Sequence, residues 1–144
     1  MRLRLESYPV VEDIAARYGD MDANAHLNNL ALEALHENAR ATMNRGLLPD
    51  AYRAGGRRLR LVTSQNTVHF LAEAHWPVLI TTGAAVGRIG RTSYVASTAL
   101  FIDRTCIGVC DTVLVLLGEQ GPAALSEEFR TALKTVLLRA PGST

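Results

Sequence analysis

Four strand-like segments follow one another along the second half of the chain, and they limit the folds that this sequence can adopt. They cover residues 57–70, 78–86, 92–102 and 106–117 and are rich in Val, Ile, Thr, Leu and Phe. This composition is typical of β-strands. The connections at residues 87–91 and 103–105 have the lengths of hairpin loops. Neighbouring strands are therefore predicted to pair antiparallel.

A long amphipathic helix is predicted ahead of these strands. Apolar residues recur at helical spacing from Leu27 to Met43. Asn28 or Asn29 is a suitable N-cap for such a helix, and Gly46 is the predicted stop at its other end. One long helix before a run of strands indicates a helix packed on a sheet.

Shorter elements complete the predicted layout. Residues 10–17 are predicted to form a first strand, and residues 47–56, with a proline and a glycine pair, a connection. A closing helix is predicted to begin at residues 126–128 and to end by Pro141. Its apolar residues are Phe129, Leu133, Val136 and Leu137. The result is an α+β fold, and residues 1–144 are predicted to form a single domain.

Charge and hydropathy exclude several classes of protein. The chain has 15 Lys and Arg against 14 Asp and Glu, a formal net charge of +1, without the strongly basic character of a nucleic-acid binder. No apolar run approaches the roughly 20 residues of a membrane span, and residues 1–13 lack the apolar centre of a secretory signal. We therefore expect a cytoplasmic protein that binds neither nucleic acid nor membrane.

Two features of the strands carry further expectations. Segments 92–102 and 106–117 have apolar residues at both odd and even positions, whereas a half-solvated antiparallel sheet would alternate. We expect another copy of the chain to cover part of the second face.

Cys106 and Cys110 lie on one strand, about 13 Å apart, too far for a disulfide. Both are predicted to be buried, reduced thiols.

Asp, Asn and His residues are concentrated directly before the long helix, in the segment GDMDANAHLNN at residues 19–29. Asp22, Asn24 and His26 carry polar groups that can act on a carbonyl. The start of a helix also presents unpaired backbone N–H groups. A carboxylate beside such an oxyanion-stabilising site favours acyl hydrolysis.

This segment and the helix that follows, with its sequence ENAR, resemble the hotdog-fold thioesterases of the 4-hydroxybenzoyl-CoA and acyl-ACP (acyl carrier protein) thioesterase kind. The likeness covers nearly the whole chain, including the turn GRIGRTSY and the strand CIGVCDTVLVLL. The resemblance implies a hotdog fold, in which a curved antiparallel sheet of about five strands wraps one long central helix. It also implies a homodimer or homotetramer with active sites at the subunit interface. The D-x-N-x-H-x-N-N pattern of plant-type acyl-ACP thioesterases is matched in register by Asp22, Asn24, His26, Asn28 and Asn29.

The resemblance also assigns roles to residues of this segment. Asp22 corresponds to the catalytic carboxylate, acting as a general base on water or as a nucleophile. The backbone N–H at about Asn29 would polarise the thioester carbonyl, and Asn24 and His26 would orient Asp22 or the water. Capping is the alternative role for Asp and Asn residues before a helix. We expect Asp20 to have a structural role.

The phosphates of CoA require Arg, Lys or free N–H groups at an exposed site. Arg88 and Arg91, with Thr92 and Ser93 close by, flank a glycine-containing turn and are predicted to contact these phosphates. An ordinary basic hairpin is the alternative. No metal and no cofactor are predicted, because the remaining histidines lack zinc-ligand spacing and the cysteines form no C-x-x-C pair.

The sequence therefore predicts a thioesterase that hydrolyses acyl-CoA or acyl-ACP to a free acid and a thiol. A hotdog hydratase or dehydratase acting on acyl thioesters is an alternative, disfavoured because the acid and histidine of those enzymes are arranged differently. A non-catalytic acyl-CoA-binding module is a further alternative, since a fold does not establish catalysis.

Overall fold

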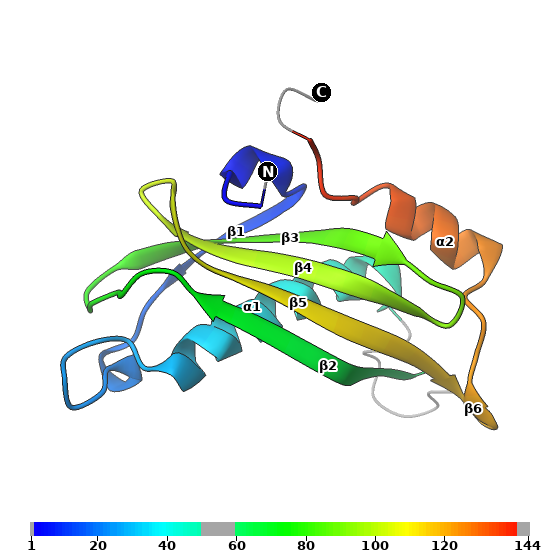
Figure 1. The fold of residues 1–144 in the computed structure, drawn as a ribbon, viewed down its shortest axis with the longest axis horizontal. Helices are drawn as coiled ribbons and strands as arrows, with labels where there is room; N and C mark the ends of the chain where they lie inside the picture. The colour runs from blue at the N-terminus through cyan, green and yellow to red at the C-terminus, as the bar shows by residue number, and fades with distance from the viewer. Residues whose placement is uncertain (1, 50–59, 141–144) are drawn as a thin grey trace.

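A curved antiparallel sheet wraps one long helix in the computed structural model, which describes residues 2–49 and 60–140 (Figure 1). The strand order is β1-β3-β4-β5-β2, and a short β6 pairs with β5. This arrangement confirms the predicted α+β hotdog fold. The elements in chain order are η1 (Leu5–Ser7), β1 (Val10–Ala15), η2 (Tyr18–Asp20), α1 (Asn29–Leu47), β2 (Arg60–Phe70), β3 (Leu79–Ile89), β4 (Ser93–Ile102), β5 (Thr105–Gly118), β6 (Gly121–Pro122) and α2 (Glu127–Lys134).

Helix α1 begins where the sequence predicts and ends later. The Oδ1 atom of Asn28 accepts a hydrogen bond of 2.7 Å from the backbone N–H of Ala31, so Asn28 is the N-cap. The predicted stop at Gly46 is wrong, because the helix continues to Leu47. Leu47 and Leu48 pack against the main core, and this packing outweighs the weak helix propensity of the glycine.

The core lies between α1 and the concave face of the sheet and has two parts. The larger part surrounds Met43 of α1 and Tyr94 of β4 and extends to α2. The smaller part lies beneath the polar segment 19–29 and fixes its position relative to the sheet. The buried residues of this smaller part are Leu27, Leu32, Ala74, Ile80, Leu100 and Ile107.

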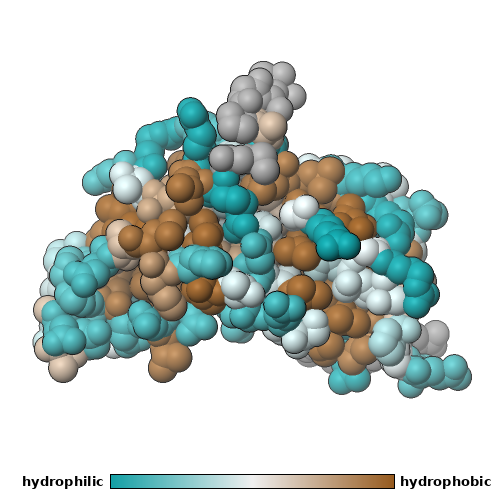
Figure 2. Space-filling view, in the orientation of Figure 1, coloured by the Kyte–Doolittle hydropathy of each residue, from teal (hydrophilic) through white to brown (hydrophobic). Residues whose placement is uncertain are grey.

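The convex face of the sheet is covered partly by the chain itself. The ring of Tyr8 packs edge-on against Phe101, with ring centroids 5.9 Å apart, and both side chains are buried. Leu5 and Leu138 pack against the same cluster. This part of the second face is therefore covered by the chain itself, and the expectation that another copy covers part of that face stays a prediction. Figure 2 shows the same view of the molecule, with apolar side chains visible between polar ones.

Strand β3 is longer than predicted. It passes Val86 and continues to Ile89, with a register shift between Val86 and Arg88. The turn between β3 and β4 is therefore reduced to residues 90–92. The predicted loop 87–91 is wrong in its first half because these residues still pair with β4.

The end of the chain also differs from the prediction. Helix α2 ends at Lys134, whereas the sequence pattern extends the helix to Val136 and Leu137. The backbone N–H of Val86 donates to the carbonyl of Val136 (2.8 Å), and the N–H of Leu138 donates to the carbonyl of Val86 (2.9 Å). Strand β1 begins opposite Ala84, so it leaves the backbone groups of Val86 on that side unpaired, and pairing with them replaces the last helical turn.

Two predictions of element ends lie outside the described residues: the connection and strand start at residues 50–59, and the helix stop at Pro141. Both cysteines are free, as predicted, and Cys110 is buried; the prediction of burial is wrong for Cys106, which is only partly buried because it lies at the start of β5. Within residues 2–49 and 60–140, no helix is long and apolar enough to cross a membrane.

The packing of Tyr8 on the sheet can be tested by substitutions at two glycines. A Cβ atom at Gly83 would lie 2.7 Å from the Tyr8 ring, whereas a Cβ atom at Gly46 would meet nothing within 4 Å. We expect Gly83→Ala to lower the free energy of unfolding by about 1–3 kcal/mol through overpacking. Gly46→Ala, the matched control in α1, should raise it by about 0.5–1 kcal/mol. Urea denaturation measures both, and equal effects of the two substitutions would contradict the contact.

Candidate active site

The loop before α1 is stabilised by the carboxylate of Asp20. Its Oδ2 atom accepts a hydrogen bond from the backbone N–H of Arg17 (2.9 Å), and its Oδ1 atom accepts one from the Arg17 guanidinium (3.0 Å). Both hydrogen bonds lower the pKa of Asp20, and the bond from the backbone N–H contributes more than the bond from the guanidinium. The Asp20 carbonyl also accepts from the N–H of Asn28. These contacts agree with the expected structural role.

Asp22 folds the next part of the loop around itself. Its Oδ1 atom accepts hydrogen bonds from the backbone N–H groups of Asn24 (2.9 Å) and His26 (3.1 Å). The backbone N–H of Asp22 donates to the carbonyl of His26 (2.7 Å), and Ala25 lies in the left-handed region with φ 62°. The loop therefore uses one carboxylate oxygen, and neither of these bonds uses Oδ2. The side chain is exposed to solvent.

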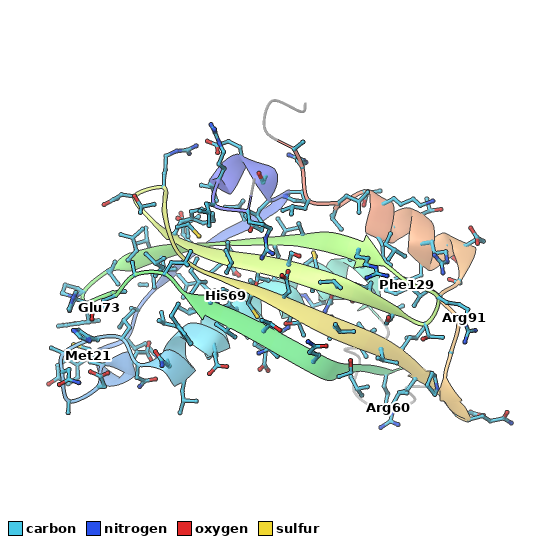
Figure 3. The ribbon with its side chains drawn as sticks, in the orientation of Figure 1. Met21, Arg60, His69, Glu73, Arg91 and Phe129 are labelled. Carbon is cyan, nitrogen blue, oxygen red and sulfur yellow. The ribbon has the colours of Figure 1, made fainter. Side chains whose placement is uncertain are left out.

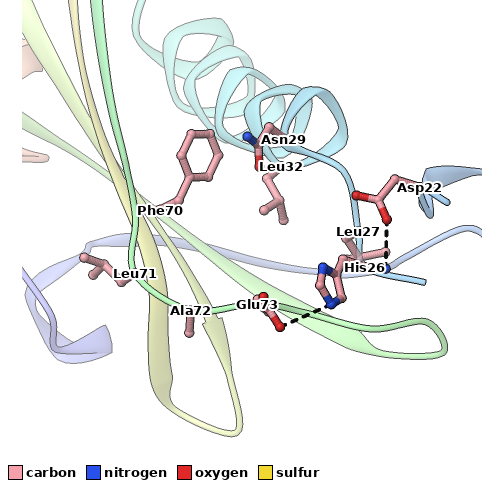
Figure 4. Close-up of a pocket in the computed structure, with 9 residues that line it drawn as sticks. All are labelled: Asp22, His26, Leu27, Asn29, Leu32, Phe70, Leu71, Ala72 and Glu73. Atoms are coloured by element: carbon pink, nitrogen blue, oxygen red, sulfur yellow. Dashed lines mark hydrogen bonds and ion pairs between the residues drawn. The ribbon is translucent and has the colours of Figure 1, made fainter. Parts of the chain in front are cut away.

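Asp22 lines a pocket of about 290 Å³ (Figure 4). One wall comes from the loop and the start of α1, and the other from the end of β2 and the connection that follows it. The loop and helix contribute Asp22, His26, Leu27, Asn29 and Leu32, and the opposite wall contributes Phe70, Leu71, Ala72 and Glu73. The pocket thus combines a carboxylate, a helix start and apolar side chains.

The helix start contributes backbone donors to this pocket. Asn29 is the first residue of α1, so its N–H has no acceptor inside the helix. The N–H of Ala31 is already used by the cap residue Asn28. The positive end of the helix dipole adds to the attraction for a negatively charged oxygen. A carbonyl oxygen that acquires negative charge can therefore be stabilised here.

Three hydrogen bonds or ion pairs connect the two walls. The N–H of Leu27 donates to the carbonyl of Ala74 (2.8 Å), and Nδ1 of His75 lies 3.0 Å from the carbonyl oxygen of Ala25. Nε2 of His26 lies 3.2 Å from Oε2 of Glu73. These contacts fix the β2–β3 connection beside the loop.

Sequence analysis identified one wall of the pocket and missed the other. The structure brings Asp22, His26 and Asn29 together, whereas Asn24 contributes its backbone N–H to Asp22 and is not among the lining residues. Phe70 and Glu73 were missed because they lie more than forty positions away in the sequence. The one local signal is that Phe70 ends a predicted strand and that Glu73 follows it in the connection.

The predicted phosphate-contacting residues do not line this pocket. Arg91 lies at the β3–β4 turn, at the opposite end of the sheet from Met21 and Glu73 (Figure 3). Thr92 and Ser93 belong to the same turn and the start of β4. Arg88 lies in β3 and lines a separate groove of about 340 Å³.

A buried histidine of α1, His36, faces the sheet and is not among the residues that line the pocket. Nδ1 of His36 is 2.8 Å from Oγ1 of Thr98, and the side chain is almost fully buried. Burial, with smaller contributions from the charges of Arg40 and Arg2, lowers the pKa of His36 to about 4. His36 is therefore neutral near neutral pH. Glu37 on the same helix lies 3.9 Å from Arg40 and is not a pocket residue.

Comparison with known protein families identifies the class. The family model of the thioesterase-like superfamily matches residues 16–133, which include the loop, α1 and all the long strands that follow it. The chain belongs to this superfamily. This result confirms the resemblance to hotdog-fold thioesterases. A comparison with curated proteins gave no significant match.

Solved structures share the fold. A protein from Pseudomonas aeruginosa superposes with a TM-score of 0.84 at 24% identity, covering 96% of this chain and 98% of its own. A thioesterase from Thermus thermophilus, solved with coenzyme A and Zn, gives 0.82 at 24% identity, covering 94% and 98%. A 1,4-dihydroxy-2-naphthoyl-CoA thioesterase from Synechocystis gives 0.75 at 13% identity, covering 87% and 95%.

The low pKa of His36 generates a prediction about stability and pH. The unfolded chain binds a proton at His36 below pH 6.5, whereas the folded protein keeps it neutral down to about pH 4. The contribution of neutral His36 to the free energy of unfolding is therefore fully present above pH 6.5. It is lost as the pH falls toward 4, by at most about 3 kcal/mol. We expect His36→Gln to have a flatter profile of unfolding free energy across this window. Urea denaturation at several pH values measures it, and parallel profiles for the two proteins would contradict the assignment.

Proposed function

We propose that the protein is a thioesterase that hydrolyses acyl-CoA or acyl-ACP to a free acid and a thiol, without a cofactor. The observation that carries this proposal is the placement of the Asp22 carboxylate and the start of α1 in one pocket. A thiolate is a good leaving group, so hydrolysis needs an activated nucleophile and stabilisation of the oxyanion more than a strong acid. Membership of the thioesterase-like superfamily supports the same activity.

In this mechanism Asp22 activates the nucleophile. Its Oδ1 atom is engaged by the N–H groups of Asn24 and His26, so Oδ2 either takes a proton from water or attacks the thioester carbonyl directly. The N–H of Asn29 stabilises the oxygen that becomes negative. Collapse of the tetrahedral intermediate breaks the C–S bond and releases the thiolate. Attack by water gives the acid at once, whereas attack by Asp22 gives a mixed anhydride that water then hydrolyses.

The supporting residues follow from their positions. His26 lines the pocket beside Asp22 and can orient the water, and Asn24 positions the Asp22 carboxylate through its backbone N–H. Leu32, Phe70 and Leu71 present apolar surface to the acyl group. CoA as the carrier is supported by the fold neighbours from Thermus thermophilus, solved with coenzyme A, and Synechocystis, a CoA thioesterase.

The two edges of the sheet differ in a way that supports a homodimer. Edge strand β1 has 6 residues, follows Pro9 and carries Glu12 and Asp13, which are features that block further strand pairing. Edge strand β2 has 11 residues, is mostly exposed and contains neither Lys nor Pro. Natural proteins rarely leave such an edge unpaired. We infer that β2 pairs with the β2 strand of a second copy, in a homodimer or a homotetramer built from such dimers.

Antiparallel pairing of two β2 strands would join the two ends of the sheet. Arg60 of one protomer would lie near the partner's Phe70, which lines the partner pocket. The β3–β4 turn lies at the Arg60 end of the sheet (Figure 3). We propose that this turn supplies the phosphate contacts of CoA bound to the partner pocket. The proposed contact residues are Arg88, Arg91, Thr92 and Ser93.

The role of Asp22 is tested by Asp22→Asn. The amide keeps an oxygen that can accept the two loop hydrogen bonds, so the loop should retain its fold while the carboxylate is lost. We expect kcat for a panel of acyl-CoA substrates to fall at least about 100-fold. Asp103→Asn, at a left-handed position of the β4–β5 turn that Asn tolerates, is the matched control. An unchanged kcat in Asp22→Asn would remove Asp22 from the mechanism.

The sharing of sites between protomers is tested by a hybrid dimer. Arg91→Ala should lower kcat/KM about tenfold or more through loss of a charged hydrogen bond. Co-expression with Asp22→Asn under two affinity tags yields hybrids in which one site keeps both Asp22 and the partner's Arg91. We expect about half of the wild-type activity with the wild-type KM. A hybrid that retains the raised KM would show that Arg91 acts in its own protomer or outside the site.

A further inference from the structure

Three side chains with metal-binding atoms converge where the loop before α1 meets the β2–β3 connection. The ligand atoms of His26, Glu73 and His75 all lie within 4.8 Å of one another. Nε2 of His26 and Oε2 of Glu73 are 3.2 Å apart, and the two imidazole rings contact edge to face with centroids 4.8 Å apart. No local motif predicts this grouping, because His26 is separated from the other two residues by almost fifty positions.

The hydrogen bond of His75 determines which ring nitrogen is available. Nδ1 lies 3.0 Å from the carbonyl oxygen of Ala25, and a carbonyl can only accept a hydrogen bond. Nδ1 therefore carries the proton, and Nε2 of the neutral ring has a free lone pair. A ring N–H bound to a backbone carbonyl is also the usual arrangement around a metal-binding histidine, since it fixes the tautomer and the ring orientation.

The backbone beneath the three side chains is fixed from both sides. The N–H of Leu27 donates to the carbonyl of Ala74, so the residues that follow His26 and Glu73 are paired directly. The loop is also closed around the Asp22 carboxylate, which accepts from the N–H of His26. A cation would therefore need adjustments of side-chain rotamers and not of the backbone.

The chemistry of the three groups defines the cation they fit. Two imidazoles and one carboxylate suit Zn²⁺ and similar divalent transition metals, whereas Mg²⁺ and Ca²⁺ prefer oxygen ligands. Ligands about 2.0–2.1 Å from a tetrahedral zinc ion lie roughly 3.3 Å from one another. His26 and Glu73 already have this spacing, at 3.2 Å. Among the residues that the structure describes, His26 is the one ion-pair partner of Glu73.

We propose that His26, Glu73 and His75 form a three-ligand binding site for Zn²⁺ in the wall of the pocket. The fourth position would be left to water, because Glu73 and His75 are exposed to solvent. Bound zinc would connect the loop to the β2–β3 connection and would engage the His26 ring that lines the pocket. This proposal departs from the prediction of no metal, which considered spacing along the sequence alone. It does not depend on the proposed activity.

Metal binding is tested directly on the full chain. Protein stripped with EDTA and passed through a desalting column is titrated with Zn²⁺ against a chromophoric zinc indicator. We expect one Zn²⁺ per chain with a dissociation constant in the micromolar range or below. His75→Gln and Glu73→Gln should each weaken binding by at least about tenfold. His69→Gln, the same substitution at an exposed histidine of β2, is the control and should bind as the wild type does.

Thermal unfolding provides a second readout. Zinc that binds the folded chain raises Tm, so the wild type and His69→Gln should gain stability on addition of Zn²⁺ while His75→Gln should not. Absence of zinc binding by the wild type, or equal binding by wild type, His75→Gln and Glu73→Gln, would overturn the proposal. Neither readout uses catalysis, so a negative result leaves the thioesterase proposal untouched.

Discussion

Burial of α1 in the concave face of the sheet is the interaction on which the rest of this structure depends. One helix must fill the whole inner surface, so its position along the sheet is set by side chains over most of its length, from Leu32 to Met43. The N-terminal end of the helix is consequently placed next to the end of β2. A rigid core thus creates the pocket, because it fixes a helix start, with its free N–H groups, opposite an apolar strand end.

Capping and catalysis are compatible within the loop that leads into this helix. Asp20 and Asn28 satisfy backbone groups at the two ends of the loop. Asp22 also accepts two backbone hydrogen bonds, yet both use Oδ1. A carboxylate has two oxygens and about four acceptor positions, so one oxygen can organise the loop while the other remains available to a substrate. The structural role of Asp22 and its proposed catalytic role therefore share one sequence pattern, which is why composition alone did not separate them.

The sequence predicts what is local and misses what the tertiary structure adds. The helix start, the five long strands and the grouping of Asp22, His26 and Asn29 follow from short-range patterns, because each depends on residues within one or two turns. Glu73 and His75 lie close to the loop because the β2–β3 connection packs beside it in the folded protein. The spacing of residues along the sequence does not indicate this proximity. The covering of Phe101 by Tyr8 was missed for the same reason. The predicted end of α1 was wrong for a similar reason. Glycine is a common helix stop, but Leu47 and Leu48, which follow Gly46, pack against the core.

The distance between the pocket and the basic turn connects oligomeric state with substrate recognition. Arg91 lies at the opposite end of the sheet from Met21 and Glu73 (Figure 3), so in the proposed complex a second protomer would supply the phosphate contacts. A two-fold axis through the centre of paired β2 strands exchanges the two ends of the sheet and would bring each turn toward the other pocket. The unprotected edge of β2 and the position of Arg91 are independent observations, one about backbone pairing and one about charge, and the proposed two-fold symmetry would account for both.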